Sequence, residues 1–263
     1  MSQLRFWRRI NRVRRGIWGK PVMTYCVGLL LNEGMVLLSD TRTNAGLDNI
    51  STYRKMFVFE EPGERVIAIM TAGSLSVTQT TIARLREAVE DGDASGETSI
   101  MLAPTLLKVA EIVGNMLASV RADVDEKLST MRQHASASLI VAGQRKGGAM
   151  RLFLIYPEGN FIEATEDTPF LQIGEHKYGK PILDRVVRPE TSLADAQKAV
   201  LLSMDSTLRS NLSVGMPLDL AVIERDACRV TQARRIEAGD EGFRAMSEAW
   251  SQALRDGFTK IRL

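Results

Sequence analysis

Thr24 directly follows Met23 and begins an apolar run, TYCVGLLLN. A threonine hydroxyl is a poor nucleophile at neutral pH and needs an adjacent base. If Met23 is removed, the free α-amine of Thr24, whose ordinary pKa is about 7.7–8.0, can act as that base. One residue would then supply both nucleophile and base. The ordinary alternative is an internal threonine that happens to follow a methionine.

Two charged residues downstream could assist such a nucleophile. Asp40, in SDTRTNAG, lies 16 residues after Thr24, at the end of a second apolar run. A hairpin through Glu33-Gly34 would fold that end back beside Thr24. Lys55, in TYRKMFVF, enters the next strand. A lysine cation can keep the amine neutral, and an aspartate can hold the lysine in place. Each residue alone also fits a turn or a solvated strand edge.

Gly73, in MTAGS, lies at a predicted strand-to-helix turn, where its backbone N–H could face a developing oxyanion. A simple turn at the start of a helix is the alternative. The chain's two histidines, His134 and His176, form no Ser/His/Asp or metal-ligand pattern, and we see no phosphate-binding loop. We therefore expect no metal and no cofactor.

The hydrophobic pattern predicts blocks of strands and helices in alternation. Strands are predicted over 24–41, 55–73, 136–165 and 219–236, and helices over about 74–91, 104–128, 178–187, 192–209 and 241–258. Two facing sheets with helix pairs outside would bury every apolar face. We therefore expect an α+β fold, a four-layer α-β-β-α sandwich, although an α+β domain with one sheet also fits the pattern.

Residues 1–23 differ from the rest in charge. The whole chain has 34 Lys and Arg against 32 Asp and Glu, but this leader holds seven cations and no acid. The remaining chain is thus mildly acidic, which argues against a nucleic-acid partner. The leader has two interpretations: a helix on an anionic surface, or a misassigned start, with translation beginning at Met23. Residues 24–263 are expected to form a single domain.

The two cysteines, Cys26 and Cys228, lie in apolar contexts without metal-ligand spacing, as expected in a reducing compartment. The longest apolar run is too short to span a bilayer, and we find no secretory signal. We expect a cytoplasmic protein.

Taken together, these blocks resemble a known family. The threonine start, the Asp in a D-x-R-x-x-x-G setting, the Lys near position thirty and the A-G-S turn resemble proteasome β-subunits, which are N-terminal-nucleophile (Ntn) hydrolases. Two later blocks, 173–185 and 203–223, are similar to the bacterial ancestral β-subunit group called Anbu. The resemblance covers residues 24 to about 237 and implies the proteasome β-subunit type of fold.

The resemblance also implies roles for individual residues. Thr24 would be nucleophile and base, Lys55 its pKa-lowering partner, Asp40 the orienting carboxylate and Gly73 the oxyanion donor. The pocket for the residue preceding the scissile bond would be lined by Thr43, Thr71 and Leu75.

Some positions depart from the family pattern. Lys55 lies one residue nearer the threonine than usual. Glu175 stands where the family has a supporting serine, and an ionised carboxylate cannot donate as a hydroxyl does. Ser210 and Ser213 occupy the positions of a further Asp and Ser, with Asp205 as a gapped alternative. Met23 is not the glycine that usually precedes a self-processed threonine, but it suits removal of the initiator methionine.

Three functions fit these residues. The first is a threonine peptidase that hydrolyses peptide bonds in unfolded polypeptides within a homo-oligomeric assembly. The second is a catalytically weak proteasome-like scaffold that binds partners. The third is an Ntn amidase acting on small amides. The completeness of the predicted site favours the peptidase. An ATPase or another substrate-feeding partner is left open.

Overall fold

A computed structural model describes residues 24–44, 50–92, 98–128 and 135–262. Both interpretations of the leader concern residues 1–23, which lie outside the described residues. In the described part of the chain, no helix is long and apolar enough to cross a membrane.

The first sheet carries the start of the described chain. Its order is β10-β1-β2-β11-β12, with antiparallel neighbours throughout. The Glu33-Gly34 turn joins β1 to β2, as predicted, and sets the register in which Cys26 pairs with Ser39. The strands are β1 (Tyr25–Leu30), β2 (Gly34–Asp40), β10 (Phe170–Gly174), β11 (Leu218–Glu224) and β12 (Gln232–Ile236).

The second sheet has its strands in sequence order, β5-β6-β7-β8-β9, also antiparallel. Its strands are β5 (Met56–Glu61), β6 (Arg65–Gly73), β7 (Ala137–Arg145), β8 (Arg151–Ile155) and β9 (Phe161–Glu163). A short ribbon of β3 (Arg42–Asn44) and β4 (Ile50–Thr52) stands between β2 and β5 in the chain. Strands β3, β4 and β10 were not predicted.

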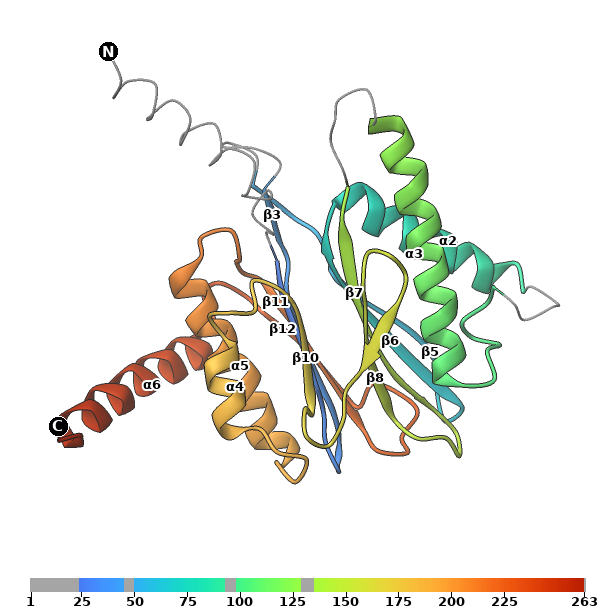
Figure 1. Cartoon of the computed structure of the whole chain (residues 1–263). Coiled ribbons are helices and arrows are strands. Elements are labelled where there is room, and N and C mark those ends of the chain that lie inside the picture. The colour runs from blue at the N-terminus through green and yellow to red at the C-terminus, as the bar shows by residue number, and fades with distance from the viewer. Residues whose placement is uncertain (1–23, 45–49, 93–97, 129–134, 263) are drawn as a thin grey trace, which may run out of the picture.

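Helices cover the outer face of each sheet (Figure 1). Helices α2 (Leu75–Glu90) and α3 (Leu106–Leu128) pack on the second sheet, and α4 (Lys180–Val186) and α5 (Leu193–Ser210) on the first. Helix α6 (Glu241–Lys260) packs on α5 and extends away from the body. The helix predictions are therefore confirmed to within a few residues.

Three apolar layers hold the fold together. One lies between α2, α3 and the second sheet, one between the two sheets, and one between the first sheet and α4, α5. Alternation along each strand sends successive side chains into different layers: on β2, Val36 and Leu38 face the helices, whereas Met35 and Leu37 face the other sheet. This is the predicted four-layer α-β-β-α sandwich, and the single-sheet alternative is wrong.

Gly114 lies at a tight contact between α3 and the turn after β8. A Cβ built at Gly114 would lie 2.1 Å from the carbonyl oxygen of Gly159. We expect Gly114→Ala to lower the free energy of unfolding by about 1–3 kcal/mol, because α3 must shift off the turn. The matched control is Gly257→Ala in α6, where a Cβ meets nothing within 4 Å; it should be neutral or slightly stabilising. Urea unfolding measures both, and equal effects would contradict this view of the packing.

Candidate functional site

A buried ion pair occupies the end of the β1–β2 hairpin. The Lys55 Nζ donates to Asp40 Oδ1 at 2.8 Å and to the carbonyl oxygen of Arg42 at 2.6 Å. Asp40 is 0% exposed and Lys55 is 5% exposed. Burial raises the pKa of the Asp40 carboxyl above its ordinary value, and the Lys55 ammonium opposes that rise. Asp40 can keep its charge here because donors surround it.

The same carboxylate holds the backbone beside Thr24. The N–H of Tyr25 donates to Asp40 Oδ1 at 3.1 Å, so Lys55 and the Thr24–Tyr25 peptide share one oxygen. The hairpin thus brings Asp40 beside Thr24, as the sequence spacing predicted, and the ion pair with Asp40 holds Lys55 at the same place. Thr24 itself is 4% exposed.

Glu175 fixes the other side of Thr24 through its backbone. The Glu175 N–H donates to the carbonyl oxygen of Thr24 at 2.8 Å. The preceding Gly174 has φ +83°, and a Cβ there would lie 1.9 Å from that same oxygen. Only glycine permits this approach. The contact does not depend on the Glu175 side chain, which is half-buried.

Tyr25 anchors the residue after Thr24. Its hydroxyl lies 2.6 Å from Ser203 Oγ on α5 and accepts a hydrogen bond from Gln172 on β10. Burial raises the pKa of this hydroxyl, so it stays protonated. A Cβ at Gly179 would meet Ser203 Oγ at 2.2 Å, so this position also has no room for a side chain. The sequence analysis did not identify any of these four residues, which are Tyr25, Gln172, Gly179 and Ser203. Only Tyr25 could have been identified, because it is adjacent to Thr24.

The loop after α5 supplies the third donor to Asp40. The Gly215 N–H donates to Asp40 Oδ2 at 3.3 Å, and Arg42 packs so tightly on Gly215 that a Cβ there would lie 2.1 Å from Arg42 Nε. Ser213 donates to Asn211 Oδ1 through both its N–H and its hydroxyl, at 2.9 and 2.6 Å. Ser213 therefore shapes this loop.

The structure does not bring every predicted residue to the cluster. Ser210 is exposed at the end of α5. Asp205, the gapped alternative, accepts from Ser247 Oγ at 2.7 Å and pairs with Arg209, so its carboxylate joins α5 to α6. Supporting roles for Ser210 and Ser213 stay predictions.

Gly73 ends β6 with φ +111°, and a Cβ there would lie 2.3 Å from the carbonyl oxygen of Ser136. The next residue, Ser74, donates its N–H to that oxygen and precedes α2. Gly73 is exposed, so the strand-to-helix turn reaches the surface. Its role as an oxyanion donor stays a prediction.

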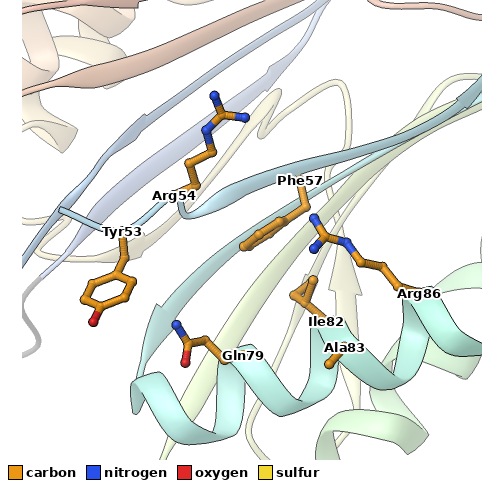
Figure 2. A pocket seen from close by; sticks show the side chains of 7 residues that line it. All are labelled: Tyr53, Arg54, Phe57, Gln79, Ile82, Ala83 and Arg86. Atoms are coloured by element: carbon orange, nitrogen blue, oxygen red, sulfur yellow. The ribbon is translucent and has the colours of Figure 1, made fainter.

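A pocket of about 310 Å³ lies between β5 and α2 (Figure 2). Gln79 stands one turn beyond Leu75, and Phe57 stands two residues beyond Lys55. The Arg86 guanidinium lies over the Phe57 ring, 5.3 Å from its centroid, while Arg54 points away from that ring. The lining residues are Tyr53, Arg54, Phe57, Gln79, Ile82, Ala83 and Arg86.

None of the three predicted pocket residues, Thr43, Thr71 and Leu75, lines this pocket, and their role stays a prediction. Thr71 is buried, and its N–H donates to the Lys55 carbonyl oxygen at 2.9 Å. Leu75 is the first residue of α2, and Thr43 lies on β3.

Comparison with known proteins places the chain in a family. The proteasome subunit family model matches residues 24–223. "Proteasome subunit beta 2" of Pyrobaculum calidifontis is 24% identical over 209 residues, which cover 79% of this chain and 92% of that protein. The chain belongs to the proteasome subunit family.

Solved structures define the group more narrowly. Anbu from Hyphomicrobium sp. strain MC1 is 49% identical with a TM-score of 0.82, and the match covers 91% of this chain and 99% of that one. A structure described as the helical assembly of the Anbu complex from Pseudomonas aeruginosa is 42% identical, with a TM-score of 0.85 and coverage of 91% and 98%. Within the proteasome family, the chain therefore groups with Anbu, the ancestral β-subunit.

The effects of Asp40 and Lys55 on stability should be strongly coupled. Removing either side chain leaves the charge of the other buried without its partner. We expect Asp40→Asn to lower the free energy of unfolding by about 3–5 kcal/mol. Lys55→Met should raise the pKa of Asp40 further and should also destabilise. The double variant Asp40→Asn/Lys55→Met should lose clearly less than the two singles combined.

Urea unfolding at pH 7 and fixed protein concentration measures this cycle. If the double variant loses the sum of the two single losses to within about 0.5 kcal/mol, the two side chains act independently.

Proposed function

We propose that the chain is an N-terminal threonine peptidase that cleaves unfolded polypeptides within a homo-oligomeric assembly. The observation that carries the proposal is the buried Asp40–Lys55 pair, whose carboxylate also binds the Thr24–Tyr25 peptide. Removing two charges from water costs about as much free energy as their attraction returns, so a buried ion pair adds little net stability. Its position beside a candidate nucleophile therefore favours a catalytic role.

The reaction requires Thr24 to be the first residue. Its Oγ attacks the substrate carbonyl carbon while the hydroxyl proton passes to the α-amine. The Gly73 N–H stabilises the oxyanion, and the C–N bond breaks as the ammonium returns a proton to the leaving amine. Water then hydrolyses the ester, with the same amine as base. Lys55, held by Asp40, favours the neutral amine through its positive charge.

The pocket between β5 and α2 suits the substrate residue that precedes the scissile bond. Tyr53, Phe57, Ile82 and Ala83 supply apolar lining, as is usual for side-chain pockets. Enclosure of the threonine by self-assembly would restrict access to unfolded chains. An ATPase that feeds substrate remains compatible with this proposal.

The first test concerns the N-terminus. Intact mass of the native protein should correspond to a chain that starts at Thr24, and a peptide epoxyketone should add to its N-terminal peptide through both hydroxyl and amine. Thr24→Ala should abolish the adduct and peptide cleavage together, because alanine keeps the amine without the nucleophile. Thr24→Ser should retain part of both.

A wild-type chain that starts at Thr24 and assembles, yet shows neither adduct nor cleavage, would favour the scaffold. Cleavage of small amides alone would favour the amidase.

The second test fills the pocket. Ala83→Trp places a large ring among Phe57, Ile82 and Gln79, so labelling by an epoxyketone with leucine before the warhead should slow about tenfold or more. An epoxyketone with alanine there should react at nearly the wild-type rate. Equal slowing of both probes would mean that the pocket does not receive this residue.

A further inference from the structure

A second pocket lies near the β1–β2 turn, at the opposite end of β1 from Thr24. Its volume is about 280 Å³. Leu31, Met150 and Ala164 are 1%, 5% and 6% exposed, and Met150 and Ala164 belong to the layer between the two sheets. The pocket therefore offers an apolar wall next to that layer. Its apolar lining residues are Leu30, Leu31, Met150, Ala164 and Pro189.

Two residues of opposite charge also line this pocket. Arg225 directly follows β11, Glu166 lies between β9 and β10, and both are exposed. Among the described residues that line the pocket, these two are the charged ones. They form no ion pair with each other in the described part of the chain. Two opposite charges that line one pocket without pairing can be joined by a ligand that carries both charges.

The guanidinium of Arg225 is held in place by the main chain. Its Nε donates to the carbonyl oxygen of Asn32, and its Nη2 donates to that of Leu31 at 2.9 Å. Its Nη1 has no hydrogen-bond partner among the described residues. The edge between Nη1 and Nη2 can bind a carboxylate through two parallel hydrogen bonds. Because this guanidinium is already positioned, it loses little conformational entropy when it binds such a group.

Glu166 suits the opposite kind of group. Its side chain makes no hydrogen bond or ion pair in the part of the chain that the structure describes. The backbone around it is ordered by a turn, in which Thr165 and Thr168 exchange two main-chain hydrogen bonds of 3.1 Å. An ionised carboxylate only accepts hydrogen bonds, so its natural partner is an ammonium group.

We propose that this pocket binds a free α-amino acid with an apolar side chain, such as leucine. The ligand's carboxylate binds Arg225, its ammonium group binds Glu166, and its side chain packs on the apolar wall. The volume of about 280 Å³ is close to the lower limit of small-molecule sites, roughly 300–1,000 Å³. A single amino acid therefore fits better than a peptide. This inference goes beyond the proposed function and does not depend on it.

The charges around the pocket select against simpler ligands. A purely anionic ligand would bring its charge toward Glu166 and toward three exposed acids that flank the lining residues in the sequence, Asp167, Glu190 and Glu224. A purely cationic ligand would bring its charge toward Arg225. Like charges placed together cost free energy, and this cost is a source of specificity. A zwitterion instead pairs with both lining charges.

The first test compares three ligands by isothermal titration calorimetry on the full chain. L-Leucine carries both charges, leucinamide lacks the carboxylate, and N-acetyl-L-leucine lacks the ammonium group. The Kd of L-leucine should be lower than that of each analogue by about tenfold or more, because each analogue leaves one charged side chain unpaired. An analogue that binds as tightly as L-leucine would overturn the inference. No binding of L-leucine at about 10 mM would overturn it too.

The second test compares Glu166→Gln with the matched control Asp167→Asn. Each variant removes one negative charge from an exposed position, but Asp167 does not line the pocket. The Kd of L-leucine should rise by about tenfold or more in Glu166→Gln and should stay unchanged in Asp167→Asn. Equal affinity of Glu166→Gln and the wild type would mean that L-leucine binds elsewhere, for example between β5 and α2, and would overturn the inference.

A third variant guards against misfolding. Glu166→Lys places a cation opposite Arg225, so it should bind N-acetyl-L-leucine about tenfold more tightly than the wild type does, and L-leucine more weakly. A gain of affinity cannot result from unfolding. If Glu166→Lys binds N-acetyl-L-leucine no better than the wild type does, residue 166 does not face the ligand and the inference is wrong.

Discussion

The charge on Asp40 is the constraint on which the rest of the site depends. A carboxylate this deeply buried is costly unless donors surround it. Three donors to it come from distant parts of the chain: the N–H of Tyr25, the ammonium of Lys55 and the N–H of Gly215. The start of β1, the entry to β5 and the loop after α5 must therefore converge, and the candidate nucleophile at Thr24 is placed by that convergence.

Convergence of this kind requires close packing at glycines. A Cβ at Gly174 would lie 1.9 Å from the carbonyl oxygen of Thr24, and a Cβ at Gly179 would lie 2.2 Å from Ser203 Oγ and 2.8 Å from the Ser203 carbonyl oxygen. These two positions have no room for a side chain, so both glycines are part of the site although they carry no functional group. Glu175 likewise contacts Thr24 through its main chain, so this contact does not depend on the Glu175 side chain.

Short-range features of the sequence predicted much of this arrangement. The Glu33-Gly34 hairpin and the 16-residue spacing placed Asp40 beside Thr24, and helical periodicity placed the helices within a few residues. Strand β10 is only five residues long, so it gave little pattern to detect. Tyr25 and Ser203 are 178 residues apart, and Asp40 and Gly215 are 175 apart. Tertiary pairs at such separations leave no trace in local periodicity, which explains why the anchors of the site were missed.

Helix α5 connects the site around Thr24 to helix α6. Ser203 on this helix contacts the Tyr25 hydroxyl, and Asp205, two residues later, accepts from Ser247 on α6. One helix therefore contacts both the residue after Thr24 and helix α6. These contacts alone do not establish that Thr24 and α6 are energetically coupled. Coupling needs an element with two states, whose equilibrium is shifted from both ends. Both contacts are made by α5, so an effect of a change at α6 on Thr24 along this route would require a shift of α5 relative to β1.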